Sequence, residues 1–207
     1  MGIANKQRRT FLKKLGLASL GFMGTGALPS KSSPSSDWSL IKPPALQKGQ
    51  TIALTAPSGG VFEPGRIIYF LEAMNHIGIR VELCDTLHKQ YGYFSAKDSF
   101  RAGELNALFR AKDINGIIAA RGGWGGARIL PLLDFEAIKQ HPKVFMGYSD
   151  ITSLLNGIYK KTGLLTFHGP MGYSQWGDYS QQNFLNILSK AHNDTLLNPP
   201  PKNGEGV

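Results

Sequence analysis

Hydrophobic residues along this chain follow two spacings in alternation, one typical of buried strands and the other typical of amphipathic helices. Five segments carry continuous or alternating apolar residues, as strands do, in the ranges 52–56, 79–84, 115–120, 143–147 and 164–167. Five segments carry apolar residues at helical spacing, in the ranges 63–76, 96–113, 127–141, 150–163 and 181–192. Strands that alternate with helices predict an α/β fold with a mostly parallel sheet and flanking helices.

Two of the expected helices have predictable details. In the range 96–113 the side that faces the core is expected to consist of Phe100, Leu105, Leu108 and Phe109. The helix over 127–141 should be interrupted at Pro131, because proline lacks the backbone N–H that a helix interior needs.

Short glycine-rich or polar segments follow four of the five expected strands. These segments are Pro57–Gly60, Arg121–Gly126, Gly147–Asp150 and His168–Pro170. Ligands of open parallel sheets bind at the carboxyl ends of the strands. We therefore expect the four segments to meet at one end of the sheet and to form the functional site there.

The first 29 residues have the layout of an export signal, with a basic start followed by a weakly apolar stretch. The pair Arg8-Arg9 precedes a Thr-Phe-Leu-Lys sequence and resembles the twin-arginine signal, although Gln7 stands where serine or threonine is more usual. The apolar stretch, residues 15–28, is shorter than the roughly 20 residues that span a bilayer. The alternative interpretation is a basic amphipathic helix on the surface.

The chain is expected to consist of four parts. Residues 1–29 would be the signal segment, 30–49 a linker, 50–195 the α/β domain, and 196–207 a truncated linker towards a second domain. The signal predicts an exported protein, located in the periplasm or at the cell wall.

The net charge of +9 suggests a nucleic-acid ligand, but the distribution of the charges argues against one. Six of the 23 basic residues lie within the first 37 residues, where Asp37 is the only acidic residue. Further along, basic and acidic residues are mixed, and no basic stripe is interleaved with aromatic residues. The five histidines and the single cysteine, Cys84, show no metal-site spacing, and Cys84 is expected to be a small core residue. We therefore expect no nucleic acid and no metal.

Gly147-Tyr148-Ser149, between an expected strand and an expected helix, matches the first half of a nucleophile elbow. In such an elbow the sharp turn pushes the serine hydroxyl out of the sheet. The residue two positions after the serine is Ile151 rather than glycine, so the general signature is incomplete. The alternative is that Ser149 or Asp150 only caps the helix, because both residue types are preferred at that position.

The segment RGGWGG, Arg121–Gly126, presents bare backbone N–H groups before an expected helix. Such groups can stabilise the oxyanion of an acyl-transfer reaction or bind phosphate. The segment lacks the spacing of the common nucleotide-binding glycine motifs, and a plain flexible turn is the third interpretation. His168, which follows the last expected strand, is either a general base or a hydrogen-bonded structural histidine.

Three segments of the chain carry a family resemblance when they are taken together. They are TAPSGG, GIIAARGGWGGARILPLLD and FMGYSDITSLLNGIYKKTGLLTFHGPM, in this order. The combination resembles the LD-carboxypeptidase family of serine peptidases, which contains muramoyl-tetrapeptide carboxypeptidases and microcin C immunity peptidases. The resemblance covers roughly Ile52 to Tyr173, and Trp124 stands where tyrosine is more usual.

The resemblance implies a Ser-His-Glu triad that is divided between two domains. It identifies Ser149 as the nucleophile, with an oxyanion hole made by the backbone N–H of Asp150 and one from Gly122 or Gly123. The glutamate and the histidine would come from a C-terminal domain that begins after a segment like KNGEGV. The chain is therefore expected to be the N-terminal half of such an enzyme, and His168 is not expected to be the triad base.

The reaction implied by the resemblance is release of the terminal D-alanine from a murein tetrapeptide, without a metal or a cofactor. The expected partner is accordingly a murein peptide, no membrane span is expected beyond the signal, and a homodimer is compatible with the resemblance. The alternative from another functional class is a non-catalytic module that binds muropeptides.

The signal segment gives a first testable prediction. Replacing both Arg8 and Arg9 by lysine should abolish twin-arginine export and leave the protein in the cytoplasm. Fractionation of cells that express the original and the double mutant checks this, and unchanged export of the mutant would contradict it.

Overall fold

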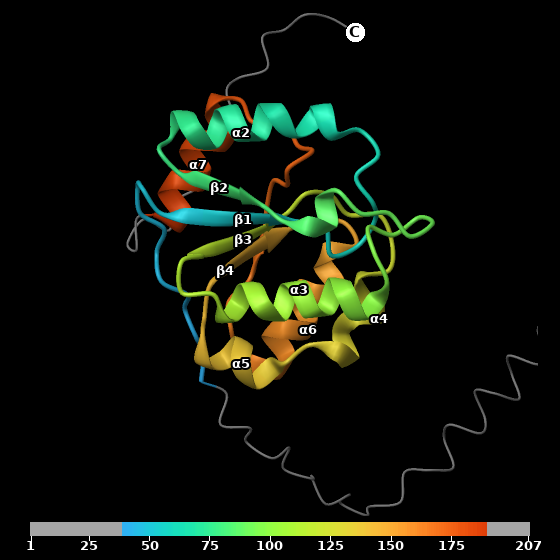
Figure 1. Cartoon of the computed structure of the whole chain (residues 1–207). Coiled ribbons are helices and arrows are strands. Elements are labelled where there is room, and N and C mark those ends of the chain that lie inside the picture. Colours follow the sequence, from blue (N-terminus) through green and yellow to red (C-terminus); the bar gives the residue numbers. More distant parts are fainter. Residues whose placement is uncertain (1–38, 190–207) are drawn as a thin grey trace, which may run out of the picture. The chain divides into compact units, whose positions relative to one another are not determined.

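The computed structural model describes residues 39–189, which contain one five-stranded sheet (Figure 1). The expected signal segment, residues 30–38 of the expected linker, residues 190–195 of the expected domain and the range 196–207 lie outside the described residues. The strands are β1 (Thr51–Thr55), β2 (Arg80–Leu83), β3 (Gly116–Ala119), β4 (Val144–Gly147) and β5 (Phe167–His168). Their order is β2-β1-β3-β4-β5, and every neighbouring pair is parallel. The α/β fold with a parallel sheet, predicted from the sequence, is confirmed.

Helices cover both faces of the sheet (Figure 1). The α-helices are α2 (Ile67–His76), α3 (Asp98–Arg110), α4 (Gly126–Ile129), α5 (Phe135–Gln140), α6 (Ile151–Thr162) and α7 (Asp178–Leu188). Short 3-10 helices, η2 (Pro64–Arg66), η3 (Asp85–Leu87) and η4 (Leu130–Leu132), join some of these elements. Helices α2 and α7 lie on one face, and α3, α5 and α6 lie on the other.

The alternation of side chains along the strands divides the core into two layers. In β3, Ile117 packs with the helices α3, α5 and α6, whereas Ile118 packs with α2 and α7. In β4, Phe145 and Met146 divide in the same way. All four side chains are buried, as expected for central parallel strands that helices cover on both faces.

Three details differ from the sequence-based expectations. Pro131 does more than interrupt a helix, since the range 127–141 is split into α4, η4 and α5. Strand β5 is only two residues long. In α3, Phe100 is 39% exposed and lies under the Lys89 ammonium, whereas the neighbouring Arg101 is fully buried. Arg101 can occupy an interior position because backbone carbonyls surround its guanidinium group.

Part of the range expected to be a linker, residues 39–49, packs against the domain. The backbone N–H of Ile41 donates to the carbonyl oxygen of Gly163 (2.9 Å), and the N–H of Leu165 donates to the carbonyl oxygen of Ile41 (2.8 Å). Leu46 is buried in the layer that contains α2 and α7. The contacts of the domain therefore begin before residue 50.

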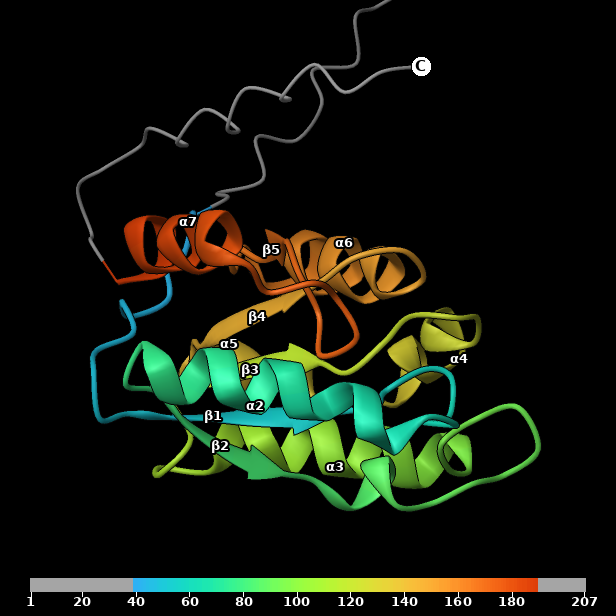
Figure 2. The ribbon, with the colours of Figure 1, turned by 90° about the horizontal axis from the view of Figure 1, so that it is seen from above.

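The strands point in the same direction, so the segments that follow them gather at one end of the sheet (Figure 2). Among residues 39–189, no helix has the length and apolar character that are needed to cross a membrane.

The close packing at the end of β4 generates a prediction about stability. A Cβ atom at Gly147 would lie 2.7 Å from Cγ2 of Ile151 and 3.3 Å from Cβ of Ala119. Replacing Gly147 by valine should therefore lower the free energy of unfolding by about 1–3 kcal/mol or more, because the buried side chains must move apart. Chemical denaturation measures the change.

Gly103, in the middle of α3, provides a matched control. An added Cβ there would meet no atom within 4 Å. Gly103→Ala should therefore raise the stability by up to about 1 kcal/mol, which is the usual difference in helix propensity. If Gly147→Val were as stable as the original protein, the turn after β4 would have space for a side chain and the packing argument would be wrong.

Candidate active site

Ser149 lies at the sharp turn between β4 and α6, where the backbone leaves the sheet. Its φ angle is +60°, and it is the only residue other than glycine with a positive φ in the part of the chain that the structure describes. The residue is exposed although it lies only two residues beyond the buried strand β4. A left-handed serine that projects from a strand-to-helix turn has the geometry of a nucleophile elbow.

The side chain of Ser149 does not cap α6. Helix α6 receives no side-chain capping hydrogen bond, and Asp150 at its N-cap has helical dihedral angles. The N–H of Thr152 is bound by the backbone carbonyl oxygen of Ser149 (3.0 Å), not by its hydroxyl group. Within residues 39–189, the Ser149 hydroxyl forms no hydrogen bond, so it is available to a ligand.

Two glycines of the RGGWGG segment are closely packed, and one of them, Gly122, lies next to Ser149. A Cβ atom at Gly122 would lie 2.9 Å from Cβ of Ser149 and 3.2 Å from the backbone nitrogen of Asp150. Gly123 has a φ angle of +117°, and a Cβ atom there would lie 2.5 Å from the Tyr93 hydroxyl. Only glycine fits at either position, and it leaves the backbone bare beside the serine.

The backbone N–H groups of Gly122, Gly123 and Asp150 are candidate oxyanion donors. Among the described residues, no backbone or side-chain acceptor binds any of the three. The structure brings Ser149, Asp150 and Gly122 together, whereas Gly123, the next residue in the chain, packs against Tyr93. Unoccupied N–H groups beside an exposed serine hydroxyl form an arrangement that could hold a developing oxyanion.

The carboxylate of Asp150 has a structural role that the sequence analysis missed. Its Oδ2 accepts hydrogen bonds from the Ser58 hydroxyl (2.5 Å) and from the backbone N–H of Gly126 (2.7 Å). Ser58 is fully buried and belongs to the Pro-Ser-Gly-Gly turn after β1, whereas Gly126 is the first residue of α4. Asp150 thus joins the turns that follow three neighbouring strands. The sequence did not indicate this role, because an aspartate before a helix is also explained by helix capping.

Aromatic side chains and a cation border the glycine segment. The ring of Trp124 is stacked on Tyr93, with centroids 5.4 Å apart, and contacts Phe94 edge-on at 4.6 Å. Trp124 is 52% exposed, so it remains accessible to solvent. Arg121 donates to the carbonyl oxygen of Gly60 (2.8 Å) and lies over the Tyr93 ring. These contacts fix the segment beside the turn after β1, which argues against a freely flexible turn.

His168 lies close to the elbow but does not contact the Ser149 hydroxyl. In the parallel pairing of β4 with β5 it is opposite Gly147, and its ring centroid is 6.1 Å from that of Tyr148. Among the described residues, no histidine, aspartate or glutamate forms a hydrogen bond with the Ser149 hydroxyl. The elbow and its donors are present, but residues 39–189 place no base on the serine.

Other reactive side chains are outside this site. Cys84 is buried, and burial, with Glu104 as the next contribution, raises the pKa of its thiol to about 12. A thiol with that pKa is protonated at neutral pH and is a poor nucleophile. No group of three or more histidine, cysteine, aspartate or glutamate residues within 39–189 is arranged to hold a metal ion.

Comparison with known proteins identifies related sequences and folds. A probable murein peptide carboxypeptidase of Bacillus subtilis (strain 168) is 41% identical over 130 residues, which are 63% of this chain and 40% of the relative. The structure of the microcin C7 self-immunity protein MccF in complex with aspartyl sulfamoyl adenosine has a TM-score of 0.70 at 32% identity and covers 74% of this chain. That of the muramoyltetrapeptide carboxypeptidase from Oxalobacter formigenes has a TM-score of 0.59 at 27% identity and covers 65% of it.

The alignments cover only part of each relative. This chain spans 40% of the Bacillus protein, 48% of MccF and 46% of the Oxalobacter enzyme. Residues 52–169 match the model of the N-terminal domain of LD-carboxypeptidases. The chain belongs to the LD-carboxypeptidase family, as its motifs suggested.

Proposed function

We propose that this chain provides the nucleophile and the oxyanion hole of a serine-type LD-carboxypeptidase that releases the terminal D-alanine from murein tetrapeptides. The observation that carries the proposal is the exposed, left-handed Ser149, whose hydroxyl is free of hydrogen bonds within residues 39–189. The murein substrate is supported by the names of the Bacillus and Oxalobacter relatives. An exported enzyme would meet such a substrate at the cell wall, which agrees with the proposed twin-arginine signal.

The first chemical step follows from the position of Ser149. Its Oγ attacks the carbonyl carbon that joins the L-centre of the diamino acid to D-alanine, while a base removes the hydroxyl proton. The carbonyl oxygen becomes an oxyanion that accepts hydrogen bonds from the N–H of Asp150 and from Gly122 or Gly123. Collapse of the intermediate breaks the amide bond, and the departing D-alanine amine takes up a proton. Water then hydrolyses the acyl-enzyme and regenerates the serine.

The base of this mechanism is assigned to a part of the protein other than residues 39–189. No histidine in that range contacts the Ser149 hydroxyl, and a serine hydroxyl without a positioned base is a weak nucleophile. The family resemblance implies that the histidine and its glutamate partner belong to a second domain. The described domain then contributes the attacking atom and the electrostatic stabilisation, and the second domain contributes proton transfer.

Substitution of Ser149 distinguishes a nucleophile from a structural residue. Ser149→Ala should leave the stability nearly unchanged, because the hydroxyl forms no hydrogen bond within the described residues and no cap is lost. Ser149→Gly should raise the free energy of unfolding by about 1 kcal/mol, since glycine adopts a positive φ without strain. Chemical denaturation of the two variants measures both effects.

The effect on activity is measured in a protein that joins this chain to a second domain of the family. There, both substitutions should lower the rate of D-alanine release by several orders of magnitude. The residual rate would come from the oxyanion hole and substrate binding alone. Full activity of Ser149→Ala would contradict the proposal. A stability loss of about 1 kcal/mol in Ser149→Ala would instead favour the helix cap.

The 207-residue chain alone should release no measurable D-alanine from a murein tetrapeptide. The reason is that Ser149 lacks a positioned base within the described residues. Chromatographic detection of D-alanine, with Ser149→Ala as the control, tests this expectation. Robust release that depends on Ser149 would show that the chain completes its own triad, and His168 would then become the first candidate for the base.

Calorimetry with the same tetrapeptide tests the non-catalytic alternative. Tight binding by the 207-residue chain, combined with absence of turnover in the form that carries a second domain, would favour a module that only binds muropeptides.

A further inference from the structure

Arg101 is a fully buried cation that the reaction described above does not use. It belongs to α3, and its side chain is 0% exposed. Burial of an unpaired charge is strongly unfavourable, so a buried arginine requires partners for its donors. The identity of these partners shows what Arg101 holds in place.

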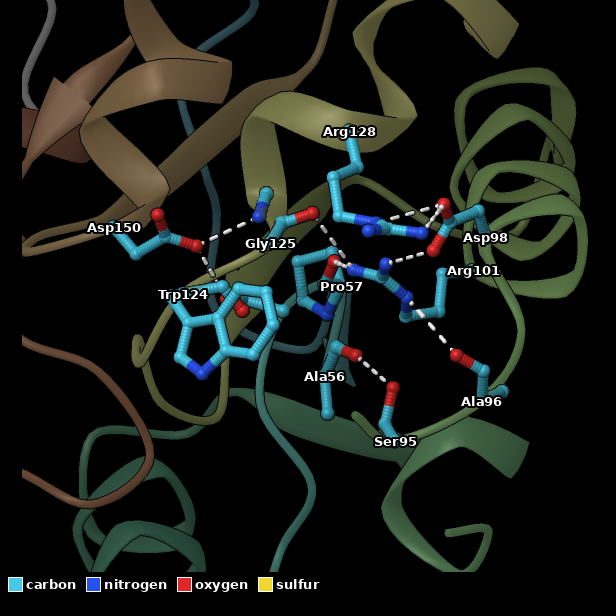
Figure 3. A network of polar contacts seen from close by, with 12 residues as sticks. Ala56, Pro57, Ser95, Ala96, Asp98, Arg101, Trp124, Gly125, Arg128 and Asp150 are labelled. Carbon is cyan, nitrogen blue, oxygen red and sulfur yellow. Dashed lines mark hydrogen bonds and ion pairs between the residues drawn. The ribbon is translucent and has the colours of Figure 1, made fainter. Parts of the chain in front are cut away.

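The guanidinium group binds three separate segments of backbone (Figure 3). Nη1 donates to the carbonyl oxygen of Pro57, after β1, at 2.5 Å and to that of Gly125, after β3, at 3.1 Å. Nε donates to the carbonyl oxygen of Ala96, before α3, at 3.1 Å. One side chain therefore ties together the glycine segment, the Pro-Ser-Gly-Gly turn and the start of α3.

The charge of Arg101 is balanced by Asp98, which also binds a second arginine. Nη2 of Arg101 lies 2.5 Å from Asp98 Oδ1, and Nη2 of Arg128, from α4, lies 2.8 Å from Asp98 Oδ2. The Phe94 ring lies against both guanidinium groups, at 4.9 and 5.2 Å. Hydrogen bonds from Arg128 and Arg101 lower the pKa of Asp98, so this carboxylate stays ionised at neutral pH. The cluster remains charged and anchors α4 to α3.

The peptide group between Gly125 and Gly126 connects this cluster to the elbow. Its carbonyl oxygen accepts the hydrogen bond from Arg101, and its N–H donates to Oδ2 of Asp150 at 2.7 Å. The peptide is therefore held on both sides, one by a buried cation and the other by the carboxylate of the residue that follows Ser149. Gly125 has a φ angle of +105°, a conformation that glycine allows and that the two hydrogen bonds maintain.

We propose that Arg101 is a positioning residue, which fixes the Gly125–Gly126 peptide and through it the side chain of Asp150, whose backbone N–H is an oxyanion donor. The effect of Arg101 on catalysis rests on the proposed function, whereas its effect on the position of the peptide does not. The residue acts through the peptide and touches neither the serine nor the substrate. An arginine is required because its planar fork reaches several carbonyls at once, whereas lysine provides a point charge.

Hydrogen exchange in the 207-residue chain tests the structural part without any catalysis. Arg101→Lys keeps a buried cation but removes the fork, and Gly126 should then exchange its amide hydrogen at least tenfold faster relative to the amides of β3 and β4. The chemical shift of the Gly126 amide, read by NMR, should change as well. An unchanged ratio and an unchanged shift in the folded variant would overturn the proposal.

Lys143→Met is the control for breaking hydrogen bonds from a buried cation to backbone carbonyls elsewhere in the domain. Lys143 is also buried and donates to the carbonyl oxygens of Leu108 and Ala111, but it precedes β4, at the opposite end of that strand from Ser149. This variant should speed exchange of all core amides alike and leave the relative rate of Gly126 unchanged. A selective effect on Gly126 in the control would contradict the specific role of Arg101.

Asp98→Asn provides a second variant if Arg101→Lys fails to fold. It removes the negative charge beside Arg101 and Arg128 while it keeps the shape of the side chain. Gly126 should again exchange at least tenfold faster relative to β3 and β4. If its exchange stayed coupled to that of the strands, the cluster would not hold the peptide, and the proposal would be wrong.

Kinetics in a form joined to a second domain test the catalytic part. Arg101→Lys should lower kcat by roughly 10-fold to 100-fold with little change in KM, because a displaced donor weakens the transition state more than the ground state. If kcat were unchanged while Gly126 exchanged faster, the structural role of Arg101 would be supported and its catalytic role would be contradicted. Absence of D-alanine release with Arg101 and Ser149 intact would instead count against the proposed function.

Discussion

The backbone at Ser149 is the constraint on which the arrangement of the site depends. Ser149 has a left-handed backbone, which costs a residue other than glycine about 1–2 kcal/mol. The turn keeps this conformation because the residues packed around it restrict its backbone. Gly147 brings β4 close to Ile151, and Gly122 leaves space for the serine. Both glycines leave the space that the strained turn needs, and hydrogen bonds from other groups stabilise it.

Those groups are polar and come from segments that are distant in the sequence. Asp150 binds Ser58 and the N–H of Gly126, and Arg101 binds the carbonyl on the other side of that same peptide. Hydrogen bonds are directional, so they define one conformation where apolar packing would accept several. The two apolar core layers position the strands, and this polar cluster positions the loops that follow them.

The difference between these two kinds of order explains what could be predicted from the sequence. Apolar spacing predicts strands and helices, and the residues after each strand predict a site at one end of the sheet. Ser149, Gly122 and Asp150 lie there, after β3 and β4. Arg101 could not be found in this way. Apolar spacing predicts that Phe100, not Arg101, faces the core. Arg101 is buried instead because backbone carbonyls of other segments accept its hydrogen bonds, and spacing along the chain does not reveal these acceptors. The role of the Asp150 carboxylate was not predicted either, because its donors, the Ser58 hydroxyl and the Gly126 N–H, belong to distant segments.

The strain also bears on the choice between a catalyst and a module that only binds. A binding surface can present a serine hydroxyl from an unstrained loop, and it gains nothing from a left-handed turn. An acyl-transfer nucleophile must project from the end of a strand, next to N–H groups whose hydrogen bonds are reserved for an oxyanion. Strained backbone that persists in a folded protein points to a functional constraint. The unoccupied N–H groups of Gly122 and Asp150 beside Ser149 meet the second requirement. The strained turn at Ser149, with these unoccupied donors beside it, is therefore the feature that favours catalysis over binding alone.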